Sequence, residues 1–293
     1  MNTRKRKYTT TILATALLFS LGGCVKDELH DTPHPDTGKV TVTVDWSDRG
    51  EGVDIPAEWT VTMGDYTGTE TGTTHTPDYL FNPGSYTLAA YNTPENITVS
   101  GTTATVAPET GNGTYISNVP GWLFTSVQDV TIEADTDYGL TAAMHQQVRQ
   151  LTLVIEPTGD AADRIESIEG ALSGAAGTMD FATGTYGAAS DVALHFTKIT
   201  EGSDAGKWTA TVRLLGIAGD TQRLTATLTY ADGNPADTGL ESDLTAALAD
   251  FNADKTEPLT LGGTIAETPT EAGVEAGITD WEKIDGGGVD AEM

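Results

Sequence analysis

Cys24 carries the only thiol of the 293-residue chain, and a thiol can act as a nucleophile, bind a metal or take an acyl chain. It follows a basic block at residues 4–7 and a largely apolar run over residues 11–21. That run is shorter than the roughly 20 apolar residues that a membrane-spanning helix needs. A basic start, a short apolar segment and small residues before a cleavage point are typical of a secretory signal peptide. A buried cysteine or a catalytic thiol would not explain a position where the apolar run ends, so the sequence favours a lipid attachment site.

The run Leu21-Gly22-Gly23-Cys24 resembles the lipobox of bacterial lipoproteins. This resemblance implies that residues 1–23 are a lipoprotein signal peptide, cleaved between Gly23 and Cys24. It also implies that the new N-terminal cysteine is acylated on its sulfur and on its nitrogen. Several acyl chains, at roughly 0.8 kcal/mol per buried CH₂, hold a protein stably on a membrane.

The charged run Lys26-Asp27-Glu28 resembles the export tag of surface lipoproteins in anaerobes of the Bacteroidales type. The resemblance implies an outward-facing protein, lipid-anchored in the outer membrane. The alternative is that these residues are only part of a solvated tether. Pro33 and Pro35 favour an extended linker, so we expect a lipidated tether over residues 24–38.

The remaining side chains with catalytic or ligating potential form no recognisable site. A Gly-x-Ser-x-Gly elbow is absent, and Gly111-Asn112-Gly113 lacks the rest of a phosphate-binding loop. Asp135 and Asp137 do not have calcium-loop spacing, and a chance pair of carboxylates for glycoside hydrolysis cannot be assigned from sequence. The histidines are scattered without metal-ligand spacing: His30, His34, His75, His145 and His195. We expect no catalytic, metal or cofactor site, and we expect that the protein is not an enzyme.

The chain is strongly acidic, with 43 Asp and Glu against 15 Lys and Arg and a formal net charge of −28. Cleavage before Cys24 would remove four basic and no acidic residues, which leaves 11 − 43 = −32. Such a surface repels nucleic acid and anionic lipid headgroups, so neither is an expected partner. With Cys24 acylated no disulfide can form, and stability must come from buried area and sheet hydrogen bonding.

Period-2 alternation of apolar residues with Thr predicts strands along most of the chain. Val40, Val42, Val44 and Trp46 alternate with polar residues, and so do Trp59, Val61 and Met63. The same pattern recurs near residues 151–155, 208–214 and 224–230, with Gly, Asp and Pro turn signals between the strands. This pattern predicts an all-β protein with sandwich architecture.

One segment has helical periodicity instead. Its apolar residues fall at positions i, i+3, i+4 and i+7, which are Leu244, Ala247, Leu248 and Phe251. Ser242 is the expected N-cap, and Asp243 lies in the first turn, where the helix dipole favours a negative charge. We therefore expect one short helix in the C-terminal domain.

The composition of the loops and the length of the expected strands change around residues 144–150. Long loops rich in Thr, Gly and Pro precede this point, and longer, more aliphatic strands follow it. We place a domain boundary near residue 146, with an N-terminal domain over residues 39–145 and a C-terminal domain over residues 146–285. Residues 286–293 are expected to form a flexible acidic tail. Length alone does not exclude one large β domain.

These features together resemble the fimbrillin superfamily, which supplies subunits and anchor or accessory proteins of type V pili. The resemblance rests on Cys24 and on the order of the segments 144–155, 171–177, 259–261 and 277–281. It implies two tandem β-sandwich domains with transthyretin-like topology. It also implies a surface fimbrial subunit that contributes to cell adhesion and joins other fimbrial subunits by donor-strand exchange, in which an open sheet edge accepts a strand.

Whether the chain is cleaved after Arg49 distinguishes two roles within this family. In shaft subunits an Arg-specific protease removes the first strand with its lipid, and Arg49-Gly50, in a loop-like run just after the strand expected at residues 40–46, is the candidate cleavage point here. The alternative is that Arg49 is only a loop arginine in a hairpin. An uncut chain would be a lipid-retaining anchor or accessory subunit. A donor strand would have to come from residues 273–284, which alternate only modestly, and this favours the anchor or accessory role over a polymerising shaft pilin.

A glycan-binding surface lipoprotein of a polysaccharide uptake system is the alternative from another class. Sugars stack on exposed aromatic rings. Trp59 and Trp208 alternate with apolar residues, which favours core positions for both. Trp122 lies in a predicted turn and is the best candidate for a glycan contact.

Overall fold

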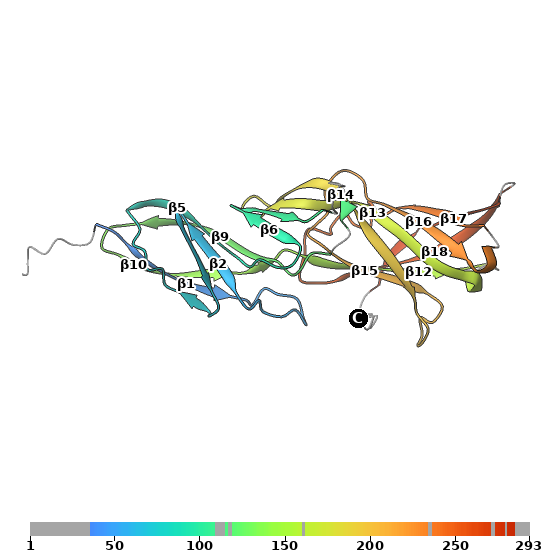
Figure 1. Cartoon of the computed structure of the whole chain (residues 1–293), viewed down its shortest axis with the longest axis horizontal. Coiled ribbons are helices and arrows are strands. Elements are labelled where there is room, and N and C mark those ends of the chain that lie inside the picture. Colours follow the sequence, from blue (N-terminus) through green and yellow to red (C-terminus); the bar gives the residue numbers. More distant parts are fainter. Residues whose placement is uncertain are drawn as a thin grey trace, which may run out of the picture.

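The computed structural model describes residues 36–108, 115–116, 119–159, 162–233, 236–270, 273–278 and 280–284. In this part of the chain the regular structure is β-strand apart from two short 3-10 turns, η2 (Ala162–Arg164) and η3 (Ala231–Gly233). The prediction of an all-β protein is confirmed. No helix among these residues is long and apolar enough to cross a membrane. Two lobes lie end to end along one long axis (Figure 1).

The strands fall into three sheets, two in the first lobe and one that runs around the second. The strands of the first lobe are β1 (Lys39–Asp45), β2 (Trp59–Met63), β3 (Tyr66–Glu70), β4 (Thr74–His75), β5 (Gly84–Tyr91), β9 (Phe124–Ile132), β10 (Asp137–Ala143) and β11 (His145–Gln146). The strands of the second lobe are β6 (Ile97–Ser100), β7 (Thr103–Val106), β8 (Tyr115–Ile116), β12 (Arg149–Pro157), β13 (Ile165–Asp180), β14 (Thr185–Lys198), β15 (Trp208–Leu214), β16 (Arg223–Tyr230), β17 (Thr238–Asp243), β18 (Leu259–Thr270), β19 (Gly273–Gly277) and β20 (Trp281–Lys283).

In the first lobe a small sheet with the order β10-β1-β4 shares a core with a larger sheet, β11-β9-β5-β2-β3. Strand β1 is the central strand of the small sheet. It pairs in parallel with β10 from Lys39 opposite Asp137 to Asp45 opposite Ala143, and antiparallel with β4. The predicted alternation is confirmed, because every second side chain of β1 is buried while the intervening ones face outward.

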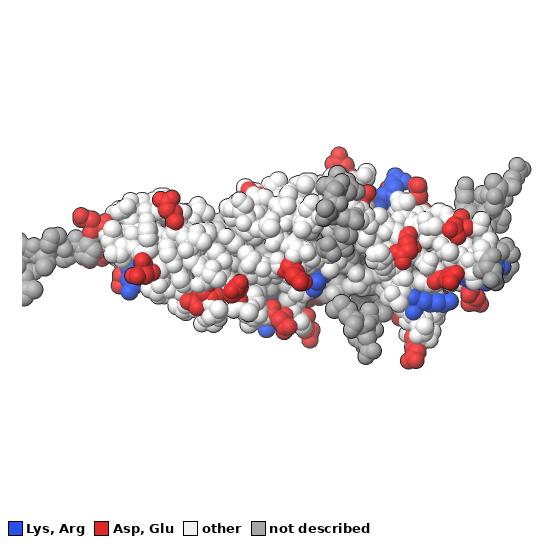
Figure 2. All heavy atoms as spheres, viewed as in Figure 1, with Lys and Arg blue, Asp and Glu red and all other residues white. Residues whose placement is uncertain are grey.

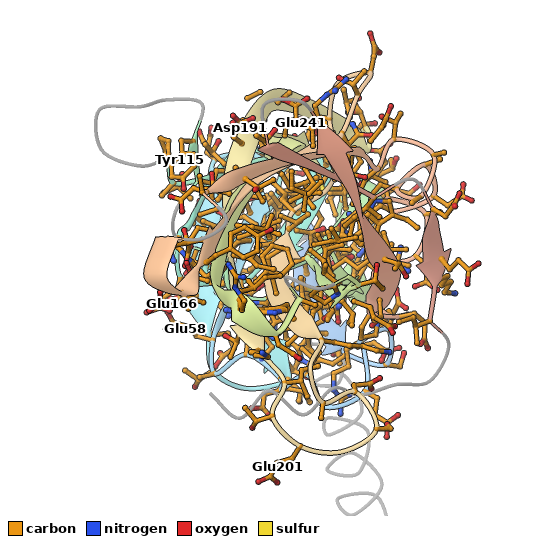
Figure 3. All side chains as sticks on the ribbon, turned by 90° about the vertical axis from the view of Figure 1, so that its right-hand side faces the viewer. Glu58, Tyr115, Glu166, Asp191, Glu201 and Glu241 are labelled. Carbon is orange, nitrogen blue, oxygen red and sulfur yellow. The ribbon has the colours of Figure 1, made fainter. Side chains whose placement is uncertain are left out.

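In the second lobe the strands form a closed circuit of pairings. The order β13-β16-β17-β19-β18-β12-β15-β14 returns to its start because β14 also pairs with β13. The circuit encloses a second and larger apolar core, to which Leu151, Leu153 and Leu228 contribute. Acidic side chains lie at the periphery of this lobe in the view along the long axis, among them Glu166, Asp191, Glu201 and Glu241 (Figure 3).

Strands β6, β7 and β8 lie in sequence between β5 and β9 of the first lobe's larger sheet, but they add to the second lobe. Strand β7 pairs with β13, from Thr103 opposite Asp180 to Thr105 opposite Thr178, and β8 pairs with β14. Tyr91 at the end of β5 also contacts Phe181 at the turn of the β13–β14 hairpin, with ring centroids 6.2 Å apart. The chain therefore crosses between the lobes more than once. The domain bounds at residues 39–145 and 146–285 stay predictions.

The predicted short helix is wrong, because residues 245–253 form consecutive turns. The expected N-cap, Ser242, lies in β17 instead, where its Oγ donates to the Ile278 carbonyl at 2.6 Å. Asp243 Oδ1 accepts from the Thr245 amide at 2.8 Å, and the Arg149 guanidinium takes the Phe251 carbonyl at 2.9 Å. The Leu248 amide bonds to the Leu244 carbonyl at 2.9 Å, four residues back, but the Phe251 amide bonds to the Leu248 carbonyl at 2.9 Å, three residues back, so the turns do not join into an α-helix. The apolar face was predicted correctly, since Leu244, Leu248 and Phe251 are buried.

Candidate assembly surface

The predicted lipidation and export residues lie outside the described part of the chain. These residues are Gly23, Cys24, Lys26, Asp27 and Glu28. The described chain starts at Asp36 and reaches β1 after the Gly38 backbone, which exchanges two hydrogen bonds of 2.8 and 2.9 Å with Phe81. The tether would therefore lead directly into the central strand of the small sheet.

Strand β1 pairs with a neighbouring strand along each edge, and one of its faces is buried in the core of the first lobe. Seven residue pairs join it to β10, and Val40, Val42 and Val44 are each at most 5% exposed. On the opposite face its threonines reach the β4 side, where Thr43 Oγ1 lies 3.1 Å from Thr74 Oγ1. Removal of β1 would open a groove lined by apolar side chains and unpaired backbone groups.

Arg49 is exposed in the loop that follows β1, as predicted, but its guanidinium is engaged by its own loop. Its Nε donates to the Val53 carbonyl at 3.1 Å and its Nη1 to the Trp46 carbonyl at 3.2 Å. These bonds close the backbone around Arg49 into a compact turn. A protease cleaves a peptide that can extend in its active site, and this turn would have to open first.

Gly50 fastens the loop to the second lobe. Its amide donates to Gln146 Oε1 at 2.8 Å, and the Gln146 amide nitrogen donates to the carbonyls of Val148 at 3.0 Å and Lys255 at 2.6 Å. A Cβ on Gly50 would lie 2.6 Å from the Thr256 carbonyl oxygen, so no larger residue fits there. The peptide after Arg49 is therefore buried against residues 96 to 206 positions further along the chain. We call these contacts of Gly50 the Gly50 clamp.

Sequence reasoning missed Gln146 as a functional residue. Its only signal in the sequence was its position at the expected domain boundary near residue 146, and its burial is seen only in the structure. An exposed contact supports the same junction, since Asp48 Oδ2 lies 2.5 Å from His145 Nδ1. Exposed ion pairs contribute little, at about 0–1 kcal/mol, so the buried amide of Gln146 is the stronger connection.

Lys255, whose backbone carbonyl accepts a hydrogen bond from Gln146, is also held by its side chain. Lys255 Nζ is buried, donates to the Leu215 carbonyl at 2.9 Å and lies over the rings of Tyr186 and Phe251. Burial and, to a smaller extent, the nearby Arg149 charge lower the pKa of Lys255 to about 7. The charged form of this lysine is therefore disfavoured in the folded protein relative to the unfolded chain.

We expect the free energy of unfolding to rise with pH above 7 because of Lys255. Between pH 7 and 10.5 the unfolded chain holds a proton on this lysine that the folded chain has lost, so raising the pH stabilises the fold. The slope contributed by one proton is about 1.4 kcal/mol per pH unit. Denaturant titrations at several pH values should show this slope, and Lys255→Met should remove it. Lys39→Met, at an exposed lysine, should leave the slope unchanged, and an equal slope in Lys255→Met would contradict the prediction.

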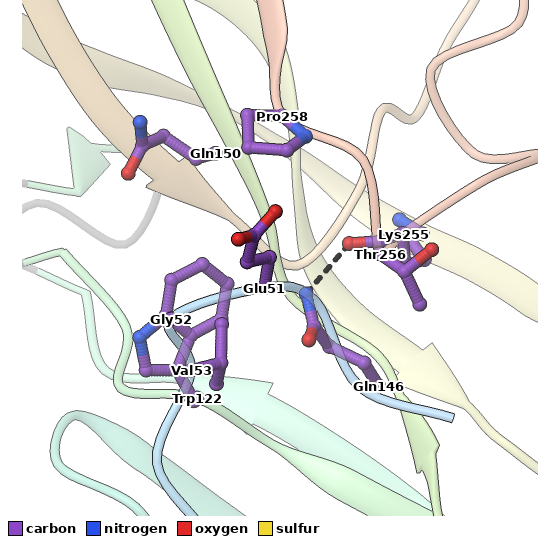
Figure 4. A pocket seen from close by; sticks show the side chains of 9 residues that line it. All are labelled: Glu51, Gly52, Val53, Trp122, Gln146, Gln150, Lys255, Thr256 and Pro258. Atoms are coloured by element: carbon purple, nitrogen blue, oxygen red, sulfur yellow. Dashed lines mark hydrogen bonds between the residues drawn. The ribbon is translucent and has the colours of Figure 1, made fainter. Parts of the chain in front are cut away.

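A notch at the junction of the lobes contains Trp122 (Figure 4). It has a volume of about 210 Å³, and its lining includes Glu51, Val53, Gln150 and Pro258. Trp122 is half-buried and packs against both lobe cores, with the Arg213 guanidinium 5.5 Å from its ring. An aromatic ring beside a carboxylate and an amide is the chemistry that holds a single sugar ring. Trp59 and Trp208 are 2% and 4% exposed, so the prediction of core positions for both is confirmed.

The predicted donor segment, residues 273–284, pairs within its own chain wherever it is described. Strand β19 pairs with β17 and β18, and β20 pairs with β18 from Trp281 opposite Gly263 to Lys283 opposite Leu261. Trp281 Nε1 also donates to Ser242 Oγ at 2.8 Å. This segment would have to leave its own fold before it could complete another subunit.

No group of three or more His, Asp, Glu or Cys side chains in the described residues has the geometry to hold a metal ion. The loop between β1 and β2, residues 46–58, is called the junction loop, and together with β1 and the notch it offers surfaces for assembly and binding.

Comparison with known proteins points to one family. The family model described as fimbrillin-A associated anchor proteins Mfa1 and Mfa2 matches residues 60–285. A search of curated proteins gave no match.

Solved structures share the fold at low sequence identity. A protein from Bacteroides ovatus described as a candidate adhesin is 16% identical, with a TM-score of 0.57 over 87% of this chain and 97% of that one. The fimbrial anchor protein Mfa2 from Porphyromonas gingivalis is 15% identical, with a TM-score of 0.56 over 82% and 95%. A candidate polysaccharide-binding protein from Bacteroides thetaiotaomicron is 12% identical, with a TM-score of 0.54 over 80% and 93%.

Proposed function

The chain belongs to the family of fimbrillin-A associated anchor proteins, and from this premise we propose that it is a lipid-retaining anchor or accessory subunit of a fimbrium. It is held on the outer membrane through Cys24, faces outward and joins other fimbrial subunits by strand addition. Its work is structural and contributes to cell adhesion. The family is one of fimbrial anchor proteins, which supports a role without catalysis.

The observation that carries the anchor role is the Gly50 clamp. A shaft pilin must lose its first strand, and the peptide bond after Arg49 would be the point of cleavage. Here Arg49 is folded back onto its own loop, and Gly50 is buried between Gln146 and Thr256. This arrangement favours a chain that keeps β1 and, with β1, its lipid.

The finer architecture belongs to the same proposal. We infer two tandem β-sandwich domains with transthyretin-like topology, over residues 39–145 and 146–285. A signal peptide, residues 1–23, and a lipidated tether, residues 24–38, precede them, and a flexible tail, residues 286–293, follows. Strand addition would use an open sheet edge, such as the outer edge of β3, which pairs with β2 on its other side.

Intact mass and N-terminal analysis of the protein from its native outer membrane tests the proposal. An acylated Cys24 at the N-terminus is the expected result, in a chain that still contains β1. An N-terminus at Gly50 in high-molecular-weight polymer would identify a shaft pilin and overturn the anchor role.

The notch supports a second candidate function, a glycan-binding surface lipoprotein. Trp122 lies in it beside Glu51 and Gln150, and its volume of about 210 Å³ accommodates one sugar residue rather than a chain. The solved structure described as a candidate polysaccharide-binding protein has a similar fold, but that likeness carries no information about this notch.

Titration with a panel of polysaccharides should shift or quench the tryptophan fluorescence if this second function is correct. The change should be lost in Trp122→Phe and weakened in Glu51→Ala, which keeps the indole in place. No change across the panel, or the same change in Trp122→Phe, would exclude a glycan site at the notch.

A further inference from the structure

We propose that Tyr79 and Leu80 form a seat on the lipid surface in which Cys24 is anchored, so that the N-terminal end of the first lobe rests against the membrane. We call these two residues the Tyr79–Leu80 seat. This inference rests on the proposed lipid anchor, and it adds a second contact with the membrane, made by the folded lobe itself.

The Tyr79–Leu80 seat is an exposed apolar pair on an otherwise polar surface. Tyr79 is 42% exposed and Leu80 is 55% exposed, and they are neighbours in the loop between β4 and β5. Across the described residues, the exposed large apolar side chains other than these two are Ile55 and Ile284.

The Tyr79 ring packs against other aromatic rings of the first lobe. The Tyr79 ring lies 4.8 Å from the buried ring of Phe81 and 5.7 Å from that of Tyr66, and Phe81 in turn contacts Tyr86 at 5.7 Å. The Tyr66 hydroxyl is hydrogen-bonded to His75 Nε2 at 2.5 Å, so its ring is held from both sides. A rigid cluster of tyrosines, each with an apolar ring and a polar hydroxyl, suits the boundary between lipid and water.

The seat lies where the tether leaves the lobe. Phe81, the residue after Leu80, exchanges both backbone hydrogen bonds with Gly38, and Asp36 is the first described residue. Eleven residues lie between Cys24 and Asp36, and the twelve residue steps of this segment span at most about 40 Å. The seat is therefore at the part of the fold that a lipid on Cys24 holds closest to the membrane.

The charge around the seat predicts which lipids it would accept. At this end of the lobe, where Figure 2 shows acidic side chains beside a smaller basic group, the exposed Lys39 is outnumbered by exposed carboxylates. They are Asp36, Asp65, Asp78, Glu133, Asp135 and Asp137. Anionic headgroups would be repelled, so the seat should prefer a zwitterionic surface and lose contact as anionic lipid is added at low salt.

Two partly inserted side chains are a weak membrane contact by themselves, since each buries only part of its small apolar surface. The anchor makes the second contact intramolecular, which raises its effective concentration. The seat would accordingly fix the orientation of the lobe on the membrane and would not by itself recruit the protein to it.

The test uses the full acylated chain in phosphatidylcholine vesicles, with an environment-sensitive fluorophore attached to Leu80→Cys. Because Cys24 is the only native cysteine and is acylated, the label is unique. Ile55→Cys is the matched control, since Ile55 is 51% exposed but lies in the junction loop at the opposite end of the first lobe. We expect the Leu80 probe to shift its emission to shorter wavelength and to be quenched by spin-labelled lipid, and the Ile55 probe to do neither.

Three results would overturn the inference. Both probes could remain in water, both could respond equally, or the Leu80 probe could shift without vesicles as the protein concentration rises, which would mean that a second copy covers the seat. Mass analysis of the same sample separates the two proposals. An unacylated Cys24 contradicts the proposed anchor, whereas an acylated Cys24 with a water-exposed Leu80 probe contradicts the seat alone.

Discussion

Replacing Gly50 with valine should make the Arg49–Gly50 bond cleavable by an arginine-specific protease under conditions that leave this bond intact in the wild-type chain. A Cβ at position 50 would lie 2.6 Å from the Thr256 carbonyl oxygen and 3.3 Å from Gln146 Oε1. The Thr256 oxygen is a backbone atom and cannot move aside, so the loop must lift from the second lobe and lose its hydrogen bond to Gln146.

The expected size of this effect follows from those two losses. Overpacking and one lost buried hydrogen bond together cost about 2 kcal/mol or more, which raises the population of the open loop at least about 30-fold. Cleavage of a transiently opened segment follows that population. Limited digestion followed by mass spectrometry, tracking the new N-terminus at Gly50, measures the rate.

Gly139→Val is the matched control for this experiment, because a Cβ at Gly139 would meet no atom within 4 Å. It should leave the rate of cleavage after Arg49 unchanged. Rapid cleavage of the wild-type chain at this bond would show that the Gly50 clamp does not protect it, and would favour the shaft-pilin role.

Val42→Asp should unfold the first lobe. Val42 is 1% exposed in the middle of β1, opposite Leu140 of β10 and His75 of β4. A carboxylate there would be buried among apolar side chains, and the His75 ring opposite is already engaged by Tyr66 and Glu70, so the cost is several kcal/mol, which is comparable to the 5–15 kcal/mol that stabilises a typical domain. Hydrogen exchange should show that amides of β1, β5 and β9 lose protection, whereas strands of the separate second core keep it.

Thr43→Asp tests the same strand from its outer face. Thr43 is exposed, and its hydroxyl contacts only the Thr74 hydroxyl among side chains, so the variant should lose about 1 kcal/mol at most. Equal destabilisation by the two variants would mean that the outer face of β1 is also buried in the functional protein, for example beneath another subunit.

Local sequence pattern predicted the parts of the fold that depend on local alternation. Strands β1, β2, β12, β15 and β16 bury the side chains that the period of two assigned to the core. The helix predicted from residues 244–251 was wrong although its apolar period was right: the Leu248 amide bonds to the carbonyl four residues back, but the amides of Ala249, Phe251 and Ala253 bond three residues back, so the segment forms turns.

The functional features depended on contacts that no local pattern contains. The loop at Arg49 was predicted, but the Gly50 clamp joins residues 96 positions apart, and a glycine next to an arginine does not indicate its partner. The addition of β6 to β8 onto the second lobe and the placement of Tyr79 and Leu80 beside the tether likewise follow from tertiary pairing. Trp122 was expected in a turn, but the structure places it in irregular chain just before β9, where it packs against both cores.

The parallel pairing of β1 with β10 has a mechanical consequence for a protein anchored at its N-terminus. A pull on the tether acts on the start of β1, while one path by which a load on the second lobe reaches the first lobe is the end of β10, which leads into β11 and β12. The two forces are opposite and run along adjacent strands. All seven residue pairs from Lys39 to Asp45 therefore share the load in shear at the same time, whereas strands peeled from one end would break their bonds one after another.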